Sequence, residues 1–281
     1  MKASRRIGAV LVAVAGAIMI AFLLLPMIAV YLDMSPGKLW DQLTTPVALK
    51  ALQLSVVTTF ISLGLILLFG TPLAYFLANN DFPGKRILEV LLQLPIVIPP
   101  AVAGVGLLLV FGRFGLIGQW LNELGINIAF TAIAVVMAQS FVAAPFYIQG
   151  ARTAFASIDP TLVSVSRTLG VSQARTFFRV VLPLSLPGLI SGAALSWGRA
   201  LGEFGATIMF AGNLPGKTQT LPLAIYSAMQ SNLGVAIAIS ALLITVAFFL
   251  LLLVKLAELW PKLKRKSRKK RGDQDAQLQH S

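Results

Sequence analysis

Two oppositely charged residues stand four positions apart in a stretch of sequence that otherwise carries no charge. Arg199 and Glu203 lie at the end of a segment in which most residues are glycine, alanine or serine. A spacing of four places both on one face of a helix, where their side chains can form an ion pair. Charged groups inside a membrane face a cavity or one another. The pair therefore either lines a solute path, together with hydroxyls such as that of Thr207, or supports helix packing around it.

The segment 211–218 fits a relaxed phosphate-loop pattern, with alanine at the position of the first glycine. A phosphate loop needs a strand before it, a helix after it and access to cytoplasmic nucleotide. This segment follows a helix of small residues and is predicted below to lie outside the cell. We therefore expect no nucleotide site and no ATPase activity in this chain.

Catalytic side chains are scarce. The sequence has no cysteine, which excludes a disulfide scaffold and a thiolate site, and its one histidine is His280 near the C-terminus. The sequence therefore lacks the side chains that a histidine zinc site or histidine acid–base catalysis requires. We expect no metal, no cofactor and no enzymatic activity.

The elements that must position these residues are six uncharged stretches. Of the 281 residues, 57% are hydrophobic and 12% are charged, a composition typical of an all-α polytopic membrane protein. Each stretch can hold one helix of about 20 residues, the length that crosses a bilayer. The stretches are 7–32, 51–80, 90–112, 124–150, 180–198 and 218–254, with room for the fifth to continue toward Phe210 and with the last helix beginning near Gly234.

Proline predicts a bend in the third stretch. Pro95, Pro99 and Pro100 stand at its start, and proline removes a backbone donor and bends helices. The bend either forms a gate next to Gly104 and Gly106 or is a fixed kink.

The basic residues predict the orientation. With the N-terminus in the cytoplasm, 18 Lys and Arg residues flank the spans on the inside and 4 on the outside, which is the bias expected of a membrane protein. Both termini are therefore expected in the cytoplasm, with the protein crossing a plasma membrane several times. Residues 255–281 form a basic tail that we expect to lie against anionic lipid rather than to bind nucleic acid.

A cytoplasmic segment between the fourth and fifth spans reads as a docking element. Asp159 and Pro160 are typical of a helix start, and Gly170 is typical of a helix end with a left-handed backbone. A second amphipathic stretch with Arg175 and Arg179 follows. A compact helical loop of this kind indicates a surface for a partner, and the alternative is a helix lying on lipid.

This segment resembles the loop that couples ABC importer permeases to a separate ATPase, whose pattern is EAA-x3-G-x9-I-x-LP. The matching positions are Gly170, Val180, Leu182 and Pro183, with valine in place of isoleucine. The EAA triplet falls on Ser164, Val165 and Ser166, so the acidic residue of the family is missing. The resemblance implies that these residues couple the chain to its ATPase.

Further along, the segments 199–207, 211–213 and 218–226 are similar to the molybdate-type oxyanion permeases. The resemblance covers about residues 52–254. It implies a type I ABC transmembrane domain with a coupling helix between helices 4 and 5, preceded by an additional helix in residues 1–51. It also implies a second copy of the chain, two ATP-binding cassette subunits and an external solute-binding protein. Asn213 joins Arg199, Glu203 and Thr207 as a residue of the translocation path or its support.

The resulting prediction is a permease subunit that carries molybdate, or the related tungstate or sulfate, delivered by the external binding protein. The alternative is an ion-coupled secondary transporter of small anions. Such transporters commonly contain internal repeats around midplane ion sites. The sequence shows no internal repeat, which favours the ATP-driven reading.

Overall fold

The computed structural model describes residues 2–279, and it describes the side chains of residues 8–256. The described part is helical and contains no strand. Its helices are α1 (Lys2–Leu32), α2 (Pro36–Leu43), α3 (Pro46–Asn79), α4 (Lys85–Val97), α5 (Pro100–Phe111), α6 (Gly118–Glu123), α7 (Ala132–Ala156), α8 (Pro160–Thr168), α9 (Gln173–Thr176), the π-helical turn η1 (Phe177–Val181), α10 (Leu182–Leu201), α11 (Gly205–Ala211), α12 (Leu221–Ala228) and α13 (Leu233–Gln279).

Five helical stretches are long and apolar enough to cross a membrane, and the bent pair α4–α5 makes a sixth if it is one span. The five are 8–32, 46–79, 132–156, 173–201 and 233–256. Five of the six expected spans are thus found in the expected order, and the pair α4–α5 stands at the place of the third. The fourth helix begins later than the uncharged stretch suggested, because residues 124–131 form a turn in which Gly125 and Phe130 have positive φ. Absence of charge does not by itself make a helix.

The third span is not straight. Helices α4 and α5 meet at an angle of 111°. Ile98 and Pro99 each precede a proline and are extended, with ψ of 140° and 132°, because the ring of the following proline disfavours helical backbone there. The predicted bend is therefore confirmed at the Pro99–Pro100 pair. Gly104 then lets α5 approach α11, since a Cβ at that position would lie 2.6 Å from the carbonyl oxygen of Ala206.

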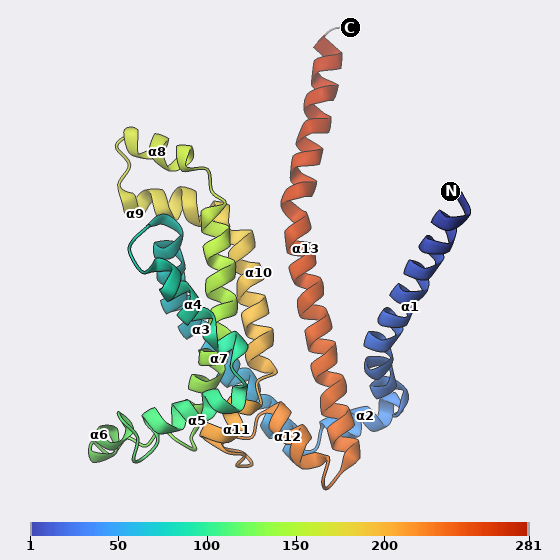
Figure 1. The fold of residues 1–281 in the computed structure, drawn as a ribbon, viewed down its shortest axis with the longest axis vertical. Coiled ribbons are helices and arrows are strands. Elements are labelled where there is room, and N and C mark those ends of the chain that lie inside the picture. The colour runs from blue at the N-terminus through green and yellow to red at the C-terminus, as the bar shows by residue number, and fades with distance from the viewer. Residues whose placement is uncertain (1, 280–281) are drawn as a thin grey trace.

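The centre of the bundle is formed by α3, α7 and α10, which pack along one another (Figure 1). Small residues allow α7 and α10 to approach closely. A Cβ on Gly150 would lie 3.1 Å from the Cα of Gly192, and one on Gly188 would lie 2.5 Å from the Cβ of Ala154. Larger side chains at Gly150 or Gly188 would therefore push the two helices apart.

Buried hydroxyls join α3 to its neighbours. The Ser62 hydroxyl donates to the Val136 carbonyl at 3.1 Å, and the Trp197 indole donates to the Thr59 hydroxyl at 3.1 Å. The Ser55 hydroxyl accepts from the Leu221 amide at 2.8 Å. These bonds satisfy polar groups that would be costly in hydrocarbon. They fix the positions of α7, α10 and α12 around α3.

The two ends of the molecule differ. Helices α8 and α9 lie at one end, toward which α1 and α13 also extend, whereas α2, α5, α6, α11 and α12 gather at the other (Figure 1). Helix α1 stands apart from the bundle, and its Tyr31 hydroxyl donates to the Ala241 carbonyl of α13 at 3.0 Å. Most of its apolar side chains are exposed, which leaves them to lipid or to another protein.

Candidate functional site

The segment between α7 and α10 folds as predicted into a short helix with a defined start and end. The Asp159 carboxylate accepts a hydrogen bond from the Thr161 amide at 2.9 Å and caps α8. Hydrogen bonds from the Thr161 backbone and side chain lower the pKa of Asp159, so the cap remains charged at neutral pH. The Gly170 amide donates to the Arg167 carbonyl at 2.9 Å, and Gly170 has φ of 76°. The left-handed conformation expected at Gly170 is confirmed.

One face of α8 packs on the bundle and the opposite face is open. Val163 contacts the apolar cluster that contains Phe155 and Val181. Leu162, Val165 and Leu169, at spacings of three and four, are 47%, 51% and 76% exposed. An exposed apolar stripe on a rigid helix end is a surface that a partner protein can cover.

The residues at the family's triplet have different surroundings. Val165 lies in the exposed stripe. The Ser164 hydroxyl donates to the Pro160 carbonyl at 3.1 Å, and the hydroxyls of Ser166 and Thr176 share a hydrogen bond of 3.0 Å between α8 and α9. Ser166 thus fixes the angle of the two short helices, and the surface of α8 carries no acidic side chain at the triplet.

Leu182 and Pro183 lie at the base of the loop, in the first turn of α10. Leu182 packs against the same apolar cluster as Val163, whereas Pro183 is exposed. Leu182 therefore belongs to the apolar cluster on which α8 packs, and it is not part of the exposed stripe of α8. Pro183 lies just after the π-helical turn η1 within the continuous helical stretch 173–201, where it has no amide hydrogen to donate.

Arg199 and Glu203 form the ion pair that their spacing predicts. Nη1 of Arg199 lies 2.7 Å from Oε2 of Glu203, and the other carboxylate oxygen accepts from the Ala206 amide at 2.8 Å. The Glu203 side chain is 1% exposed and that of Arg199 is 28% exposed. Helix α10 ends at Leu201, so the pair bridges the break before α11 rather than lying within one continuous helix. The Glu203 carboxylate therefore binds both the Arg199 guanidinium and the amino end of α11.

Thr207 and Asn213 do not share one environment. The Thr207 hydroxyl is fully buried on α11 and has no hydrogen-bond partner among the described residues. Asn213 donates to the Ser227 hydroxyl at 2.9 Å and accepts from the Gln219 amide at 3.0 Å. These bonds tie the loop after α11 to α12. Thr207 retains unused hydrogen-bonding capacity, whereas the bonds of Asn213 are structural.

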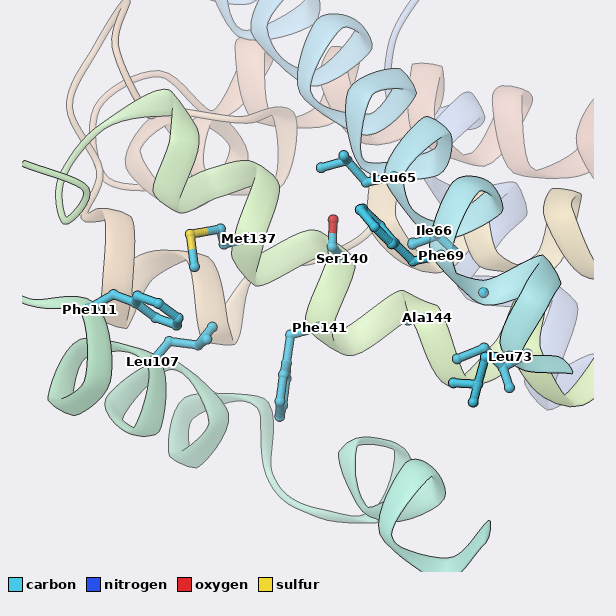
Figure 2. A pocket seen from close by; sticks show the side chains of 12 residues that line it. Leu65, Ile66, Phe69, Leu73, Leu107, Phe111, Met137, Ser140, Phe141 and Ala144 are labelled. Carbon is cyan, nitrogen blue, oxygen red and sulfur yellow. The ribbon is translucent and has the colours of Figure 1, made fainter. Parts of the chain in front are cut away.

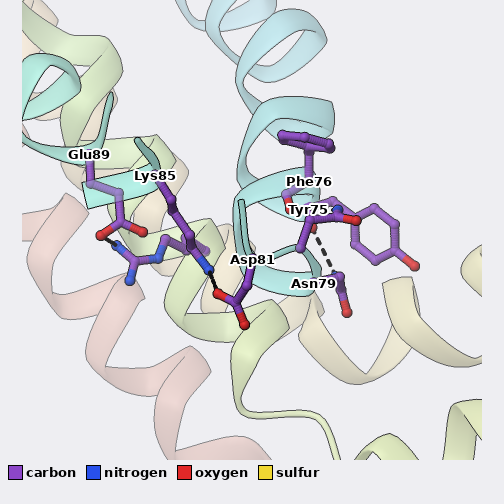
Figure 3. A network of polar contacts seen from close by, with 8 residues as sticks. Tyr75, Phe76, Asn79, Asp81, Lys85 and Glu89 are labelled. Carbon is purple, nitrogen blue, oxygen red and sulfur yellow. Dashed lines mark hydrogen bonds and ion pairs between the residues drawn. The ribbon is translucent and has the colours of Figure 1, made fainter. Parts of the chain in front are cut away.

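Two further ion pairs are present among the described residues, and one of them joins α4 to α7. Nη1 of Arg152 on α7 lies 3.2 Å from Oε2 of Glu89 on α4, and Lys85 pairs with Asp81 at 2.8 Å (Figure 3). Hydrogen bonding to Lys85 lowers the pKa of Asp81. Glu89 and Arg152 are far apart in the chain, so no spacing rule reveals their contact. In the sequence, Arg152 contributed only to the charge bias that predicts the orientation in the membrane.

An apolar cavity of about 430 Å³ lies among α3, α5 and α7 (Figure 2). Ser140 is its one polar lining residue, and the other lining side chains include Phe69, Phe111 and Phe141. Such a lining offers no set of donors for an anion. Within the described residues, no group of three or more His, Cys, Asp or Glu side chains is placed to hold a metal ion.

Comparison with known proteins places these features in context. Residues 70–262 match the family model described as binding-protein-dependent transport system inner membrane component. The chain is 42% identical over 233 residues to the molybdenum transport system permease protein ModB of Mycobacterium tuberculosis, covering 83% of this chain and 88% of the relative. It is 33% identical to the sulfate transport system permease protein CysT of Escherichia coli, covering 82% and 84%.

The fold is similar to that of a bacterial alginate ABC transporter solved in complex with an alginate-bound periplasmic protein. The TM-score is 0.64 at 18% identity, and the match covers 90% of this chain and 93% of the other. At this level of identity the likeness concerns the fold alone, that of a transmembrane domain of an ABC importer.

Proposed function

Because the chain belongs to the binding-protein-dependent transport system inner membrane component family, we propose that it is the permease subunit of an ATP-driven importer of molybdate. Tungstate and sulfate share the charge and tetrahedral shape of molybdate and are the related candidates. The proposal for the solute rests on the similarity to ModB, which is greater than that to CysT. An external binding protein would select the anion and deliver it.

The observation that carries the coupling role is the exposed stripe of α8. Leu162, Val165 and Leu169 form an apolar ridge on a helix that is capped by Asp159 and closed by Gly170. Because Val163 anchors the opposite face to the bundle, motion of a docked partner is passed to α7 and α10. Two ATP-binding cassette subunits are the proposed partners, one for each copy of the chain.

We propose a homodimer in the prokaryotic plasma membrane, with α8 and both termini in the cytoplasm. Figure 1 shows α8 at the end toward which α1 and α13 also extend, in agreement with the orientation that the basic residues predict. Closure of the ATPase subunits would favour one arrangement of the two bundles, and their opening the other. Alternating access follows because each arrangement binds its partners with different affinity.

Arg199 and Glu203 support the path in this proposal rather than bind the anion tightly. Their mutual pairing at 2.7 Å leaves a local charge close to zero. A tetrahedral dianion held by an uncompensated buried arginine would leave slowly, whereas a neutral path lets the binding protein retain the affinity. The Glu203 bond to the Ala206 amide adds a structural task that a solute-binding arginine would not require.

An ion-coupled secondary transporter remains the alternative in the test. The experiment is uptake of radiolabelled molybdate into proteoliposomes that contain the chain, with and without the ATPase subunits and the binding protein. We expect uptake only when both partners are present and ATP is supplied on the side of the membrane that carries the ATPase subunits. Uptake driven by an ion gradient in the absence of the ATPase would contradict the proposal. Competition by tungstate and sulfate ranks the three anions.

A further inference from the structure

Helix α4 turns one face to the bundle and the opposite face away from it. Leu88 and Leu92 pack against the apolar cluster that α3, α7 and α10 share. The opposite face carries an outer column of four side chains at helical spacings of three and four, namely Arg86, Val90, Leu94 and Val97. Its three apolar members are 61%, 42% and 81% exposed, and Arg86 is exposed as well. The outer column is therefore open on the surface of the described chain.

The length of the outer column matches one leaflet of a bilayer. From Arg86 to Val97, a rise of about 1.5 Å per residue gives about 16 Å. This is roughly half of the hydrocarbon thickness of a bilayer, which is about 30 Å. After Ile98 the chain turns by 111° into α5, so the outer column ends at the bend. The column thus extends from a cation to the depth of the bilayer centre.

The charged end of α4 belongs to the end of the molecule that carries α8. Asn79 at the end of α3 lines a cavity together with Pro160 and Ser164 of α8, and the short segment 80–84 leads from there into α4. In the proposed orientation this end faces the cytoplasm, where anionic lipids give the leaflet surface a negative potential. Arg86 therefore stands where lipid headgroups lie.

Arg86 has no counterion within the described chain. Its neighbour Lys85 is paired with Asp81 at 2.8 Å (Figure 3). Glu89 is paired with Arg152 of α7 at 3.2 Å. The Arg86 side chain itself forms no ion pair and no hydrogen bond with a described residue. One uncompensated positive charge at the head of an apolar column is complementary to a lipid with one net negative charge.

A hollow at the start of α4 leaves room for a headgroup. Its volume is about 360 Å³, and its lining residues are Asp81, Phe82, Gly84, Lys85, Arg86 and Ile87. Gly84 begins the helix without a side-chain cap, and the amides of Arg86 and Ile87 have no acceptor in the described chain. Free amides at a helix start favour a phosphate group. The guanidinium and these amides therefore present donors at the same hollow.

We propose that the outer column of α4 binds an anionic phospholipid of the cytoplasmic leaflet. The lipid phosphate lies at Arg86, whose guanidinium forms charge-assisted hydrogen bonds with phosphate oxygens. One acyl chain lies along Val90, Leu94 and Val97. The site goes beyond the proposed function because it involves no solute, although it uses the proposed orientation. A free phosphate ion would gain only the contacts at the charged end and none along the column.

The test measures which lipid touches α4 in a bilayer. The sequence has no cysteine, so one introduced at Leu91, which is 54% exposed beside the column, can carry a small fluorophore. The full chain is placed in vesicles of phosphatidylcholine and phosphatidylglycerol, with brominated acyl chains on one lipid at a time to quench the fluorophore on contact. We expect phosphatidylglycerol to bind about fivefold more strongly, which is the effect of one basic residue near an anionic surface.

Variants assign this preference to Arg86. Arg86→Gln should remove it, and Arg86→Lys should retain most of it because the charge is kept. Arg167→Gln is the matched control, since it removes the same charge from an exposed position of α8 that has no apolar column below it. This control should bind phosphatidylglycerol as wild type does. All three variants should keep the melting temperature of wild type, because neither arginine has a side-chain partner among the described residues.

Four outcomes would overturn the proposal. Quenching by neither lipid would show that protein, such as a second copy, covers the column. Equal binding of the two lipids, or a preference that survives Arg86→Gln, would exclude a headgroup contact at Arg86. A preference lost equally in Arg167→Gln would show only general attraction to charge. Displacement by excess soluble glycerol phosphate would show a site for a free phosphate.

The measurement is independent of the proposed function. It uses no ATPase subunit, no binding protein and no transported anion, so a failure of lipid binding leaves the proposed importer untouched. Conversely, a complete complex that takes up no tetrahedral oxyanion would contradict the proposed function and leave the lipid site standing.

Discussion

The ion pair between Arg199 and Glu203 provides the sharpest test of how the proposed path is built. Arg199→Leu removes the cation and leaves the Glu203 carboxylate, which is 1% exposed, without its charged partner. Loss of one partner of a buried pair costs about 3–5 kcal/mol. Because Arg199 is itself 28% exposed, we expect the lower end, about 3 kcal/mol.

The carboxylate has a second task that a matched variant preserves. Glu203→Gln removes the charge and keeps an oxygen that can accept from the Ala206 amide, now at 2.8 Å. In Arg199→Leu combined with Glu203→Gln no buried charge is left alone. We therefore expect the double variant to recover to within about 1 kcal/mol of wild type, the size of one neutral hydrogen bond.

The assay is the melting temperature and yield of the detergent-solubilised protein, together with ATP-driven uptake. A loss of 1 kcal/mol lowers the melting temperature by roughly 2–4 °C for a domain of about this size, so Arg199→Leu should melt several degrees below wild type. The double variant should regain most of this loss. Normal yield and melting in Arg199→Leu with complete loss of uptake would refute the structural role and assign anion contact to Arg199.

Three further predictions concern coupling, orientation and the ion pair between Glu89 and Arg152. Gly170→Val should reduce uptake while the protein stays in the membrane, because a backbone φ of 76° disfavours a β-branched residue. No atom lies within 4 Å of the added Cβ, so the cause is backbone strain and not a clash. Ser164→Ala should be milder, and normal uptake by Gly170→Val would show that this turn is not needed. Cysteine at Ser164 should resist an impermeant reagent from outside, whereas cysteine at the exposed Lys217 should react; the reverse pattern would invert the topology. Glu89→Arg combined with Arg152→Glu should restore stability that either change alone lowers by roughly 1 kcal/mol, as measured by melting, and no recovery in the swap would show that the pair is not coupled.

Local features of the proposed coupling loop could be predicted residue by residue. The cap by Asp159 and the left-handed turn at Gly170 depend on groups within a few positions of each other. Such interactions are nearly independent of the rest of the fold, because the donor and acceptor are joined by a short stretch of chain. The apolar ridge follows from the same helix period.

The bend of the third span was predicted, but its size was not. Proline excludes helical backbone at the preceding residue, which places the break at Pro99 and Pro100. The angle of 111° depends on what α5 packs against. Gly104 meets Ala206 on α11 there, and that contact joins segments far apart in the sequence.

The same limit applies to the candidate site. The spacing of Arg199 and Glu203 predicted their contact, but it did not reveal the break after Leu201 or the bond from Glu203 to the amino end of α11. Thr207 and Asn213 were grouped by position and the structure separates them, since one hydroxyl is buried without a partner and the other side chain is bonded to α12.

By itself the sequence determined the membrane class, the order of the spans, the expected orientation and the short-range caps and pairs. These depend on hydropathy, charge bias and helix period, which are properties of neighbouring residues. Only the tertiary structure decided that Glu89 meets Arg152 and which face of α4 stays exposed. Both depend on how α4 and α7 pack, and packing is set by the complementary shapes of side chains that lie far apart in the chain.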